Sequence, residues 1–269
     1  MLLTPALIAG AVACLAWWAS TGAILALVRT ADRRGLHGAA TLATLPVMGA
    51  GLWAFHVTAG QAGAVYGAFF AALAVWGWIE LAFLTGVITG PNDRPARPGV
   101  PEWERFVRAW GTVAYHEMTL TAALIGLAAM AHGAPNRFGL WTFAILYAAR
   151  ISAKLNLYLG VRKVAVEFIP TPLRHLPSHF RVARINWLFP TSVTALTFAT
   201  ACWLERAVQA GDPAQAVGFA LLATLTALAL LEHWLMIVPL PDEKLWRWML
   251  PAPAPATMTT TGEDEDAVR

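Results

Sequence analysis

Long apolar stretches separated by short polar loops dominate the sequence. Seven such stretches can be marked, over residues 4–28, 38–57, 62–89, 107–131, 138–160, 187–208 and 214–238. A helix that rises 1.5 Å per residue needs roughly 20 apolar residues to cross a bilayer core, and each stretch reaches that length. None alternates as a membrane β-strand does. The pattern therefore predicts an all-α, polytopic membrane helix bundle of about seven transmembrane helices.

Basic residues are distributed unequally between alternate loops. Fifteen of the 19 lie in the first, third and fifth loops and the tail: Arg29, Arg33, Arg34, Arg94, Arg97, Arg105, Arg108, Arg162, Lys163, Arg174, Arg181, Arg184, Lys244, Arg247 and Arg269. The other three loops hold only Arg137 and Arg206. Because basic loops stay in the cytoplasm, we expect the N-terminus outside and the C-terminus cytoplasmic. Residues 1–250 then form the seven-helix transmembrane domain, and residues 251–269 form a disordered acidic tail.

Composition agrees with a multi-pass membrane protein. The chain is 58% hydrophobic and 13% charged, with a mean hydropathy of +0.55, whereas soluble domains carry roughly 25% charged residues. The net charge of +3 resides in loops beside membrane segments, which indicates orientation in the bilayer and argues against nucleic-acid binding. We therefore expect membrane lipids as partners and no nucleic acid.

The apolar stretches are interrupted by ionisable and polar residues. The stretch 138–160 carries Arg150 and Lys154, and a cation near mid-membrane costs about 2.5 to 3.5 kcal/mol on insertion scales unless it is paired. Counted from the helix ends, the interrupting residues occupy an overlapping slab in the cytoplasmic half of the membrane. The predicted buried polar network comprises Glu80, His116, Glu117, Arg150, Lys154, Asn156, Glu232 and His233.

Depth and chain order suggest which charges pair. The stretches holding Arg150 and Glu117 are adjacent in sequence and antiparallel, which usually makes such helices neighbours. Lys154 lies one turn nearer the cytoplasm, where Glu80 and Glu232 are found. We therefore expect Glu117 to neutralise Arg150, and Glu80 or Glu232 to neutralise Lys154.

The network has three interpretations. It is a structural lock that keeps charge away from lipid, a ligand or metal site, or a path for protons or solutes. His116 and His233 could present an imidazole to the magnesium of a tetrapyrrole, or serve as hydrogen-bonded bundle histidines. Each is adjacent to a glutamate, so the paired side chains diverge by about 100° and do not follow the Glu-x-x-His spacing of carboxylate-bridged metal sites. No catalytic residue is assigned, and the metal is left unknown.

The fifth loop, residues 161–186, is the longest and most basic. Its basic surface is predicted to comprise Arg162, Lys163, Arg174, His175, His179, Arg181 and Arg184. Such a cytoplasmic surface suits anionic lipid or a protein partner. His175 and His179 are also considered for metal binding, although Pro177 between them opposes a regular helix face.

Several runs of the chain resemble a known family. SAKLN, NWLFPTSVT and LEHWLMIVPLPDEKLWRW, with YHEMTLTAALI and GAPNRFGLWTF before them, resemble the PuhE-type family of photosynthetic complex assembly proteins of purple phototrophic bacteria. The likeness extends from Trp17 to Trp248. It implies a multi-pass protein of the bacterial inner membrane, associated with genes for the reaction-centre H subunit and for bacteriochlorophyll synthesis.

The resemblance implies a role in photosynthesis. The expected function is an assembly factor for the reaction-centre/light-harvesting complex that modulates bacteriochlorophyll supply, with subunits of that complex or pigment-synthesis proteins as partners. The cofactor is left unknown, and a transiently bound bacteriochlorophyll is the one candidate considered. The alternative is a membrane-embedded enzyme, metal-dependent or not, that acts on a tetrapyrrole, isoprenoid or lipid substrate through the buried Glu/His set.

Overall fold

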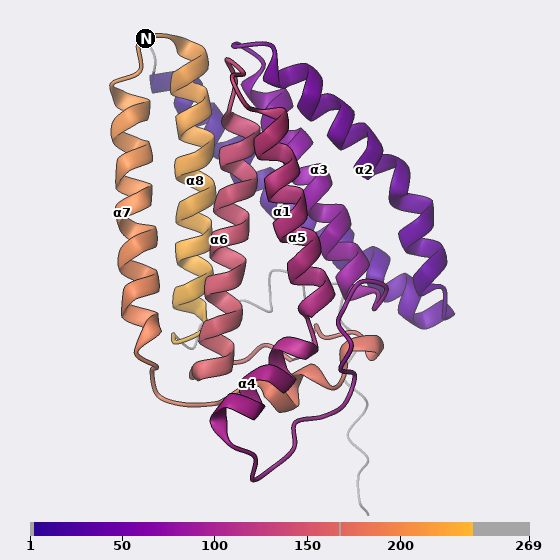
Figure 1. The fold of residues 1–269 in the computed structure, drawn as a ribbon. Coiled ribbons are helices and arrows are strands. Elements are labelled where there is room, and N and C mark those ends of the chain that lie inside the picture. Colours follow the sequence, from indigo (N-terminus) through magenta and orange to yellow (C-terminus); the bar gives the residue numbers. More distant parts are fainter. Residues whose placement is uncertain (1–2, 167, 239–269) are drawn as a thin grey trace, which may run out of the picture.

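The computed structural model describes residues 3–166 and 168–238, and these residues form a bundle of helices (Figure 1). The α-helices are α1 (Leu3–Arg34), α2 (His37–Ala59), α3 (Val65–Leu84), α4 (Glu102–Gly111), α5 (Ala114–Met130), α6 (Phe138–Leu159), α7 (Leu188–Val208) and α8 (Pro213–Leu235). Two 3₁₀ helices, η1 (Thr171–Leu173) and η2 (Leu176–His179), lie between α6 and α7. The described residues contain no strand beyond an isolated bridge between Val161 and Val182, which confirms the all-α prediction.

Four of the described helices, α1, α2, α3 and α8, are long and apolar enough to cross a membrane. The bent pair α4 and α5 supplies a fifth if it counts as one span. Helix α6 is long enough to cross a membrane, but its polar residues lower its mean hydropathy, and it is not among these four. The structure thus supports a polytopic membrane protein, and the count of seven spans stays a prediction. The predicted acidic tail, 251–269, lies outside the described residues.

The loops between long helices alternate between the two ends of the bundle (Figure 1). The turn after α1, the connection 85–101 and the segment 160–187 share one end, which also carries α4. The shorter loops 60–64, 131–137 and 209–212 share the other. The loops predicted to be cytoplasmic from their basic residues therefore lie together, as the sequence pattern requires.

The predicted stretch 107–131 is not one helix. Helices α4 and α5 meet at an angle of 67° at Thr112 and Val113. The predicted continuous helix is therefore wrong for residues 107–113, which lie in α4 and at the break. Residues 89–92 bond the backbone at this break: Asn92 N donates to the Gly111 carbonyl at 3.1 Å, and His116 N donates to the Thr89 carbonyl at 2.9 Å. A Cβ on Gly90 would lie 2.1 Å from the Gly111 oxygen, so this close passage requires glycine.

Helix α4 is amphipathic and lies across the end of the bundle (Figure 1). Its apolar residues Trp103, Phe106, Val107 and Trp110 fall on one face and are all exposed. Spacings of three and four residues place such side chains together, as in helices that lie in a membrane interface. The turn at Val113 thus separates a surface helix from the helix that enters the bundle.

Helices α3 and α6 occupy the middle of the packing. One core cluster joins α2, α3, α5 and α6 through Phe55, Val75, Ile79, Leu120 and Phe143. A second cluster joins α1, α3 and α8. Because α6 packs against α3, α5, α7 and α8, its polar side chains are directed at neighbouring helices.

Candidate functional site

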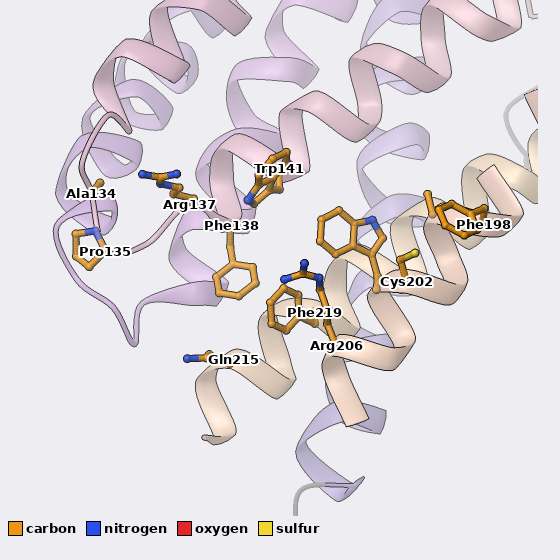
Figure 2. Close-up of a pocket in the computed structure, with 12 residues that line it drawn as sticks. Ala134, Pro135, Arg137, Phe138, Trp141, Phe198, Cys202, Arg206, Gln215 and Phe219 are labelled. Atoms are coloured by element: carbon orange, nitrogen blue, oxygen red, sulfur yellow. The ribbon is translucent and has the colours of Figure 1, made fainter. Parts of the chain in front are cut away.

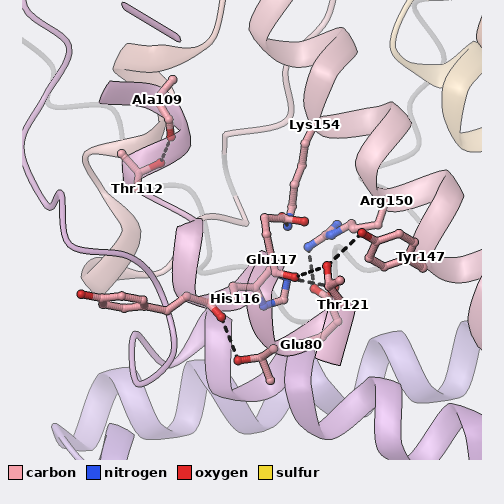
Figure 3. A network of polar contacts seen from close by, with 11 residues as sticks. Glu80, Ala109, Thr112, His116, Glu117, Thr121, Tyr147, Arg150 and Lys154 are labelled. Atoms are coloured by element: carbon pink, nitrogen blue, oxygen red, sulfur yellow. Dashed lines mark hydrogen bonds and ion pairs between the residues drawn. The ribbon is translucent and has the colours of Figure 1, made fainter. Parts of the chain in front are cut away.

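Two ion pairs connect α6 to its neighbours inside the bundle (Figure 3). Arg150 Nη2 donates to Glu80 Oε2 on α3 at 2.6 Å. Lys154 Nζ, one turn further along α6, donates to the Glu117 carboxylate on α5. The expectation that carboxylates of neighbouring helices neutralise both cations is therefore confirmed.

The partners are exchanged relative to the prediction, which assigned Glu117 to Arg150 and Glu80 or Glu232 to Lys154. The reason is the break at Thr112 and Val113. Since α5 begins at Ala114, Glu117 lies in its first turn, near the level of Lys154. Arg150 lies deeper and meets Glu80 on α3 instead.

His116 is fully buried behind the Glu80 carboxylate. Its ring packs against Phe83 with the ring centroids 4.4 Å apart, and its Nε2 lies 3.6 Å from Glu80 Oε1. This separation is too long for a hydrogen bond. His116 thus belongs to the charged group on α3, α5 and α6 as a packed neighbour of Glu80.

Glu232 on α8 takes a different partner from the one expected. Its Oε1 accepts a 2.9 Å hydrogen bond from Trp17 Nε1 on α1. The Glu232 carboxylate therefore links α8 to α1 and does not form the predicted pair with Lys154.

A second polar group is neutral and lies between α6, α7 and α8. Ser152 Oγ on α6 is 2.9 Å from both Ser192 Oγ on α7 and His233 Nε2 on α8. Asn156 Nδ2 donates to Ser192 Oγ at 3.0 Å, and its own Oδ1 accepts from Asn186 Nδ2 at 3.0 Å. The network predicted as a single group is thus divided into a charged group, a neutral group and the separate pair of Glu232 with Trp17.

The neutral group engages both ring nitrogens of His233. Its Nδ1 donates to the Ala229 carbonyl at 2.8 Å, while Nε2 contacts Ser152 Oγ. A metal or tetrapyrrole magnesium needs a free imidazole nitrogen, so His233 in this arrangement is a bundle histidine. Among the residues that the structure describes, no three His, Cys, Asp or Glu side chains gather as a metal site requires.

The predicted basic surface divides in the structure. Arg162, Arg174, Arg181 and Arg184 are exposed at the end of the bundle that carries α4. His175 and His179 are buried, contrary to the prediction that they belong to this surface. His179 Nε2 donates to the Arg94 carbonyl at 3.0 Å, which fastens η2 to the connection 85–101. Lys163 is only half-buried, and its backbone N donates to the Met236 carbonyl.

Two titratable groups at this end, His175 and Glu102, have pKa values lowered by their surroundings. Burial first, and then the neighbouring His179, lower the pKa of His175 below its ordinary value of 6.5. Glu102 at the start of α4 accepts hydrogen bonds from Arg181 at 2.8 Å and from Arg105 at 3.2 Å. These bonds lower the pKa of the Glu102 carboxyl. The pair with Arg181 ties α4 to the segment 160–187.

A cavity of about 1120 Å³ lies within the bundle, between α1, α3, α5, α6 and α8, and α4 and the segment after α6 line its far end. Its walls are mainly apolar side chains. Six charged residues also line it: Glu80, Glu117, Arg150, Lys154, Lys163 and Glu232. The charged group and Glu232, but not the neutral group, therefore face a space large enough for a ligand.

A second cavity, of about 700 Å³, lies at the opposite end between α6, α7 and α8 (Figure 2). Trp203 stacks on Phe219 with centroids 6.0 Å apart, and the Arg206 guanidinium lies 5.8 Å from the Phe219 centroid. Arg137 lines the same cavity. The two arginines of the loops predicted to be outside therefore flank one aromatic pocket.

Comparison with known proteins identifies the family. The model of the family described as "Protein of unknown function (DUF3623)" matches residues 3–257. The chain belongs to this family. A relative from Rhodobacter capsulatus, described as "Uncharacterized 30.4 kDa protein in puhA 5'region", is 52% identical to this chain over 240 residues. The matched region covers 88% of each protein. No solved structure matches this DUF3623 protein.

The network predicted from the sequence left out four residues that bond to its members in the structure: Trp17, Ser152, Asn186 and Ser192. Hydropathy does not flag an asparagine or serine near a helix start, because such residues are common as caps. The runs SAKLN, NWLFPTSVT and LEHW, on which the family resemblance rests, nevertheless contain the whole neutral group except the Ala229 carbonyl.

Proposed function

We propose that this protein is an inner-membrane assembly factor for the photosynthetic reaction-centre/light-harvesting complex and that it modulates bacteriochlorophyll supply. One observation carries the proposal: the 52% identity, over 88% of both chains, to a protein whose description locates it in the puhA 5' region. That is a photosynthesis gene region. The resemblance to PuhE-type proteins points the same way.

Three surfaces are suited to docking membrane subunits: the exposed faces of α2 and α7 and the basic end of the bundle. Helix α2 exposes Leu42 and Trp53, each with 69% of its surface accessible, and α7 exposes Phe198. Such faces pack against lipid or against helices of another membrane protein. The exposed Arg162, Arg174, Arg181 and Arg184 offer positive charge to anionic lipid or to a partner at the end carrying α4.

Deleting the gene in its phototrophic host tests the role. Near-infrared absorbance and sucrose-gradient yield of the reaction-centre/light-harvesting complex should both fall and should recover when the wild-type gene is returned. An Arg174→Glu/Arg184→Glu variant should recover less than an Arg137→Glu control, since Arg137 is an exposed arginine at the other end. Unchanged or increased complex in the deletion strain would contradict the proposal.

A membrane enzyme acting on a tetrapyrrole, isoprenoid or lipid is the second candidate. The observation that favours it is the set of charged side chains on the wall of an apolar cavity, where ionisable groups could act on a hydrophobic substrate. A Glu117→Gln variant present in normal amount would separate the two roles. An assembly factor would keep its activity in the deletion strain, and an enzyme that uses this carboxylate would lose it.

A further inference from the structure

The aromatic pocket at the end opposite α4 has an apolar floor (Figure 2). Its volume of about 700 Å³ lies within the range of about 300 to 1,000 Å³ that small-molecule sites occupy. The floor consists of aromatic side chains from α6, α7 and α8: Phe138, Trp141, Phe198, Trp203 and Phe219. Phe198 is 71% exposed and Trp141 is 44% exposed, so the floor is continuous with the outer surface of the bundle. Because tryptophans of membrane proteins gather at the level of the lipid head groups, the pocket is suited to a molecule of the bilayer.

Two arginines of the lining carry charge that no carboxylate balances. Arg137 and Arg206 both line the pocket and are exposed. Within residues 3–166 and 168–238, neither forms an ion pair. The lining includes no aspartate or glutamate of those residues. The Arg206 guanidinium lies 5.8 Å from the centroid of the Phe219 ring, which leaves its charge open to an anion.

The carboxylates nearest to Arg206 in the sequence are bonded elsewhere. Glu205 Oε1 accepts from Gln209 Nε2 at 3.1 Å, and Asp212 Oδ1 accepts from the Gln215 backbone N at 2.9 Å. Neither carboxylate lines the pocket. The described lining of this pocket is therefore positively charged, whereas the large cavity is lined by three carboxylates and three cations.

The other polar groups of the lining are mainly hydrogen-bond donors. Trp203 lines the pocket, and its Nε1 is buried without a partner in the described part of the chain. The Cys202 thiol is a weak donor, and the Gln215 amide both donates and accepts. Since guanidinium groups donate and do not accept, the lining as a whole favours an acceptor that carries negative charge.

The two arginines come from parts of the chain that are otherwise poor in basic residues. The three loops predicted to lie outside hold only Arg137 and Arg206, and the fold brings both to one pocket (Figure 2). Guanidinium groups bind phosphate through charge-assisted hydrogen bonds that are often paired. A phosphate above an apolar floor is the arrangement found in an anionic phospholipid.

We propose that this pocket binds one anionic phospholipid, with its phosphate held by Arg137 and Arg206 and an acyl chain lying against the aromatic floor. The inference goes beyond the proposed assembly role, for which the positive charge lies at the opposite end of the bundle. Failure of the binding test leaves that role untouched, because the deletion experiment measures it separately.

Two lipids with the same acyl chains test the proposal: phosphatidylglycerol and phosphatidylcholine. Native mass spectrometry of the purified full-length protein in detergent should count one tightly bound phosphatidylglycerol per chain. It should bind about tenfold or more tighter than phosphatidylcholine, because the choline cation meets the like charge of the arginines. Inorganic phosphate at the same concentration should not displace it, since free phosphate covers none of the aromatic floor. Equal binding of the two lipids, displacement by phosphate, or no bound lipid overturns the proposal.

Paired arginine variants separate this pocket from the basic end of the bundle. Arg137→Gln/Arg206→Gln should weaken binding of phosphatidylglycerol about tenfold or more, because charge-assisted bonds to the phosphate are lost. Arg174→Gln/Arg184→Gln is the matched control at the other end and should leave the affinity for the tightly bound lipid unchanged. All four arginines are exposed, so neither variant removes a buried group. If the pocket pair does not lose more binding than the control pair, the site is elsewhere.

Tryptophan variants on α7 test the aromatic floor. Ala199 lines the pocket, so Ala199→Trp should fill the floor and abolish binding of phosphatidylglycerol. Ala195→Trp, one turn away, is the matched control, because Ala195 is exposed and does not line the pocket, and it should bind as the wild type does. If the two tryptophan variants bind alike, the assignment of this pocket is wrong.

Discussion

Arg150 on α6 donates a 2.6 Å hydrogen bond to Glu80 on α3, a residue 70 positions earlier in the chain. The carboxylate is almost fully enclosed, whereas 36% of the Arg150 side chain remains exposed toward the cavity. The pair therefore links the two central helices and also places a guanidinium on the wall of the large cavity.

The Arg150 and Glu80 pair should behave as one unit in mutagenesis. Removing one member of a buried pair strands the other charge at a cost of roughly 3 to 5 kcal/mol when both are enclosed, and the partial exposure of Arg150 should reduce this cost. Arg150→Leu or Glu80→Leu alone should lower the amount of protein in the membrane, measured by immunoblotting. The double variant should recover it.

The control for this pair is Arg150→Leu/Glu117→Leu. Glu117 belongs to Lys154 in the structure, so this combination strands both Glu80 and Lys154. Its loss should be at least the sum of the single losses. Recovery in this variant, and not in Arg150→Leu/Glu80→Leu, would mean that the helices pair their charges the other way.

The neutral group should stabilise the bundle without serving the cavity. Interhelical hydrogen bonds in membranes contribute about 0.6 kcal/mol on average, and Asn156 makes such bonds to Ser192 and Asn186 as well as one to the Ser152 carbonyl. Asn156→Ala should therefore cost about 2 kcal/mol, seen as a lower Tm in detergent. Thr197→Ala, which removes only a bond within α7, should leave the Tm nearly unchanged.

Acid should weaken the packing of the segment 160–187 through His175. Because its folded pKa is below 6.5, His175 contributes full stability above pH 6.5, and the contribution is lost as the pH falls toward the folded pKa. His179 opposes protonation and Asp93 favours it. The Tm advantage of wild type over His175→Leu should shrink between pH 7.5 and pH 5.5. An equal advantage at both pH values would rule out this titration.

The seven-span topology can be checked with reporters. Alkaline phosphatase fused after Gln61, Ala134 or Ala210 should be active, since these positions lie in the loops with few basic residues. Green fluorescent protein fused after Asn92 or Arg184 should fluoresce. If a fusion shows the opposite activity, the helices before it do not all cross the membrane.

Much of the fold depends on local features that can be recognised in the sequence alone. The length of an apolar stretch and the cost of a bare charge in lipid do not depend on which helix lies next to which. Hydropathy therefore located the long helices, the alternation of their loops, and the ionisable residues of the charged group. It also placed the carboxylates and cations at overlapping depths.

The partners of those residues depend on contacts between distant segments. The break between α4 and α5 exists because residues 89–92 take up the backbone groups of Gly111 and His116, a contact that no periodicity reveals. That break sets the depth of Glu117 in the bundle. Glu117 therefore pairs with Lys154, and Glu80 pairs with Arg150. The rotation of α6 then turns Ser152 and Asn156 toward α7 and α8, away from the charges. Sequence alone thus determined which residues must be neutralised or hydrogen-bonded. Tertiary packing decided which residue is the partner of each, because a few ångströms of depth in the bundle and a fraction of a helical turn select the partner.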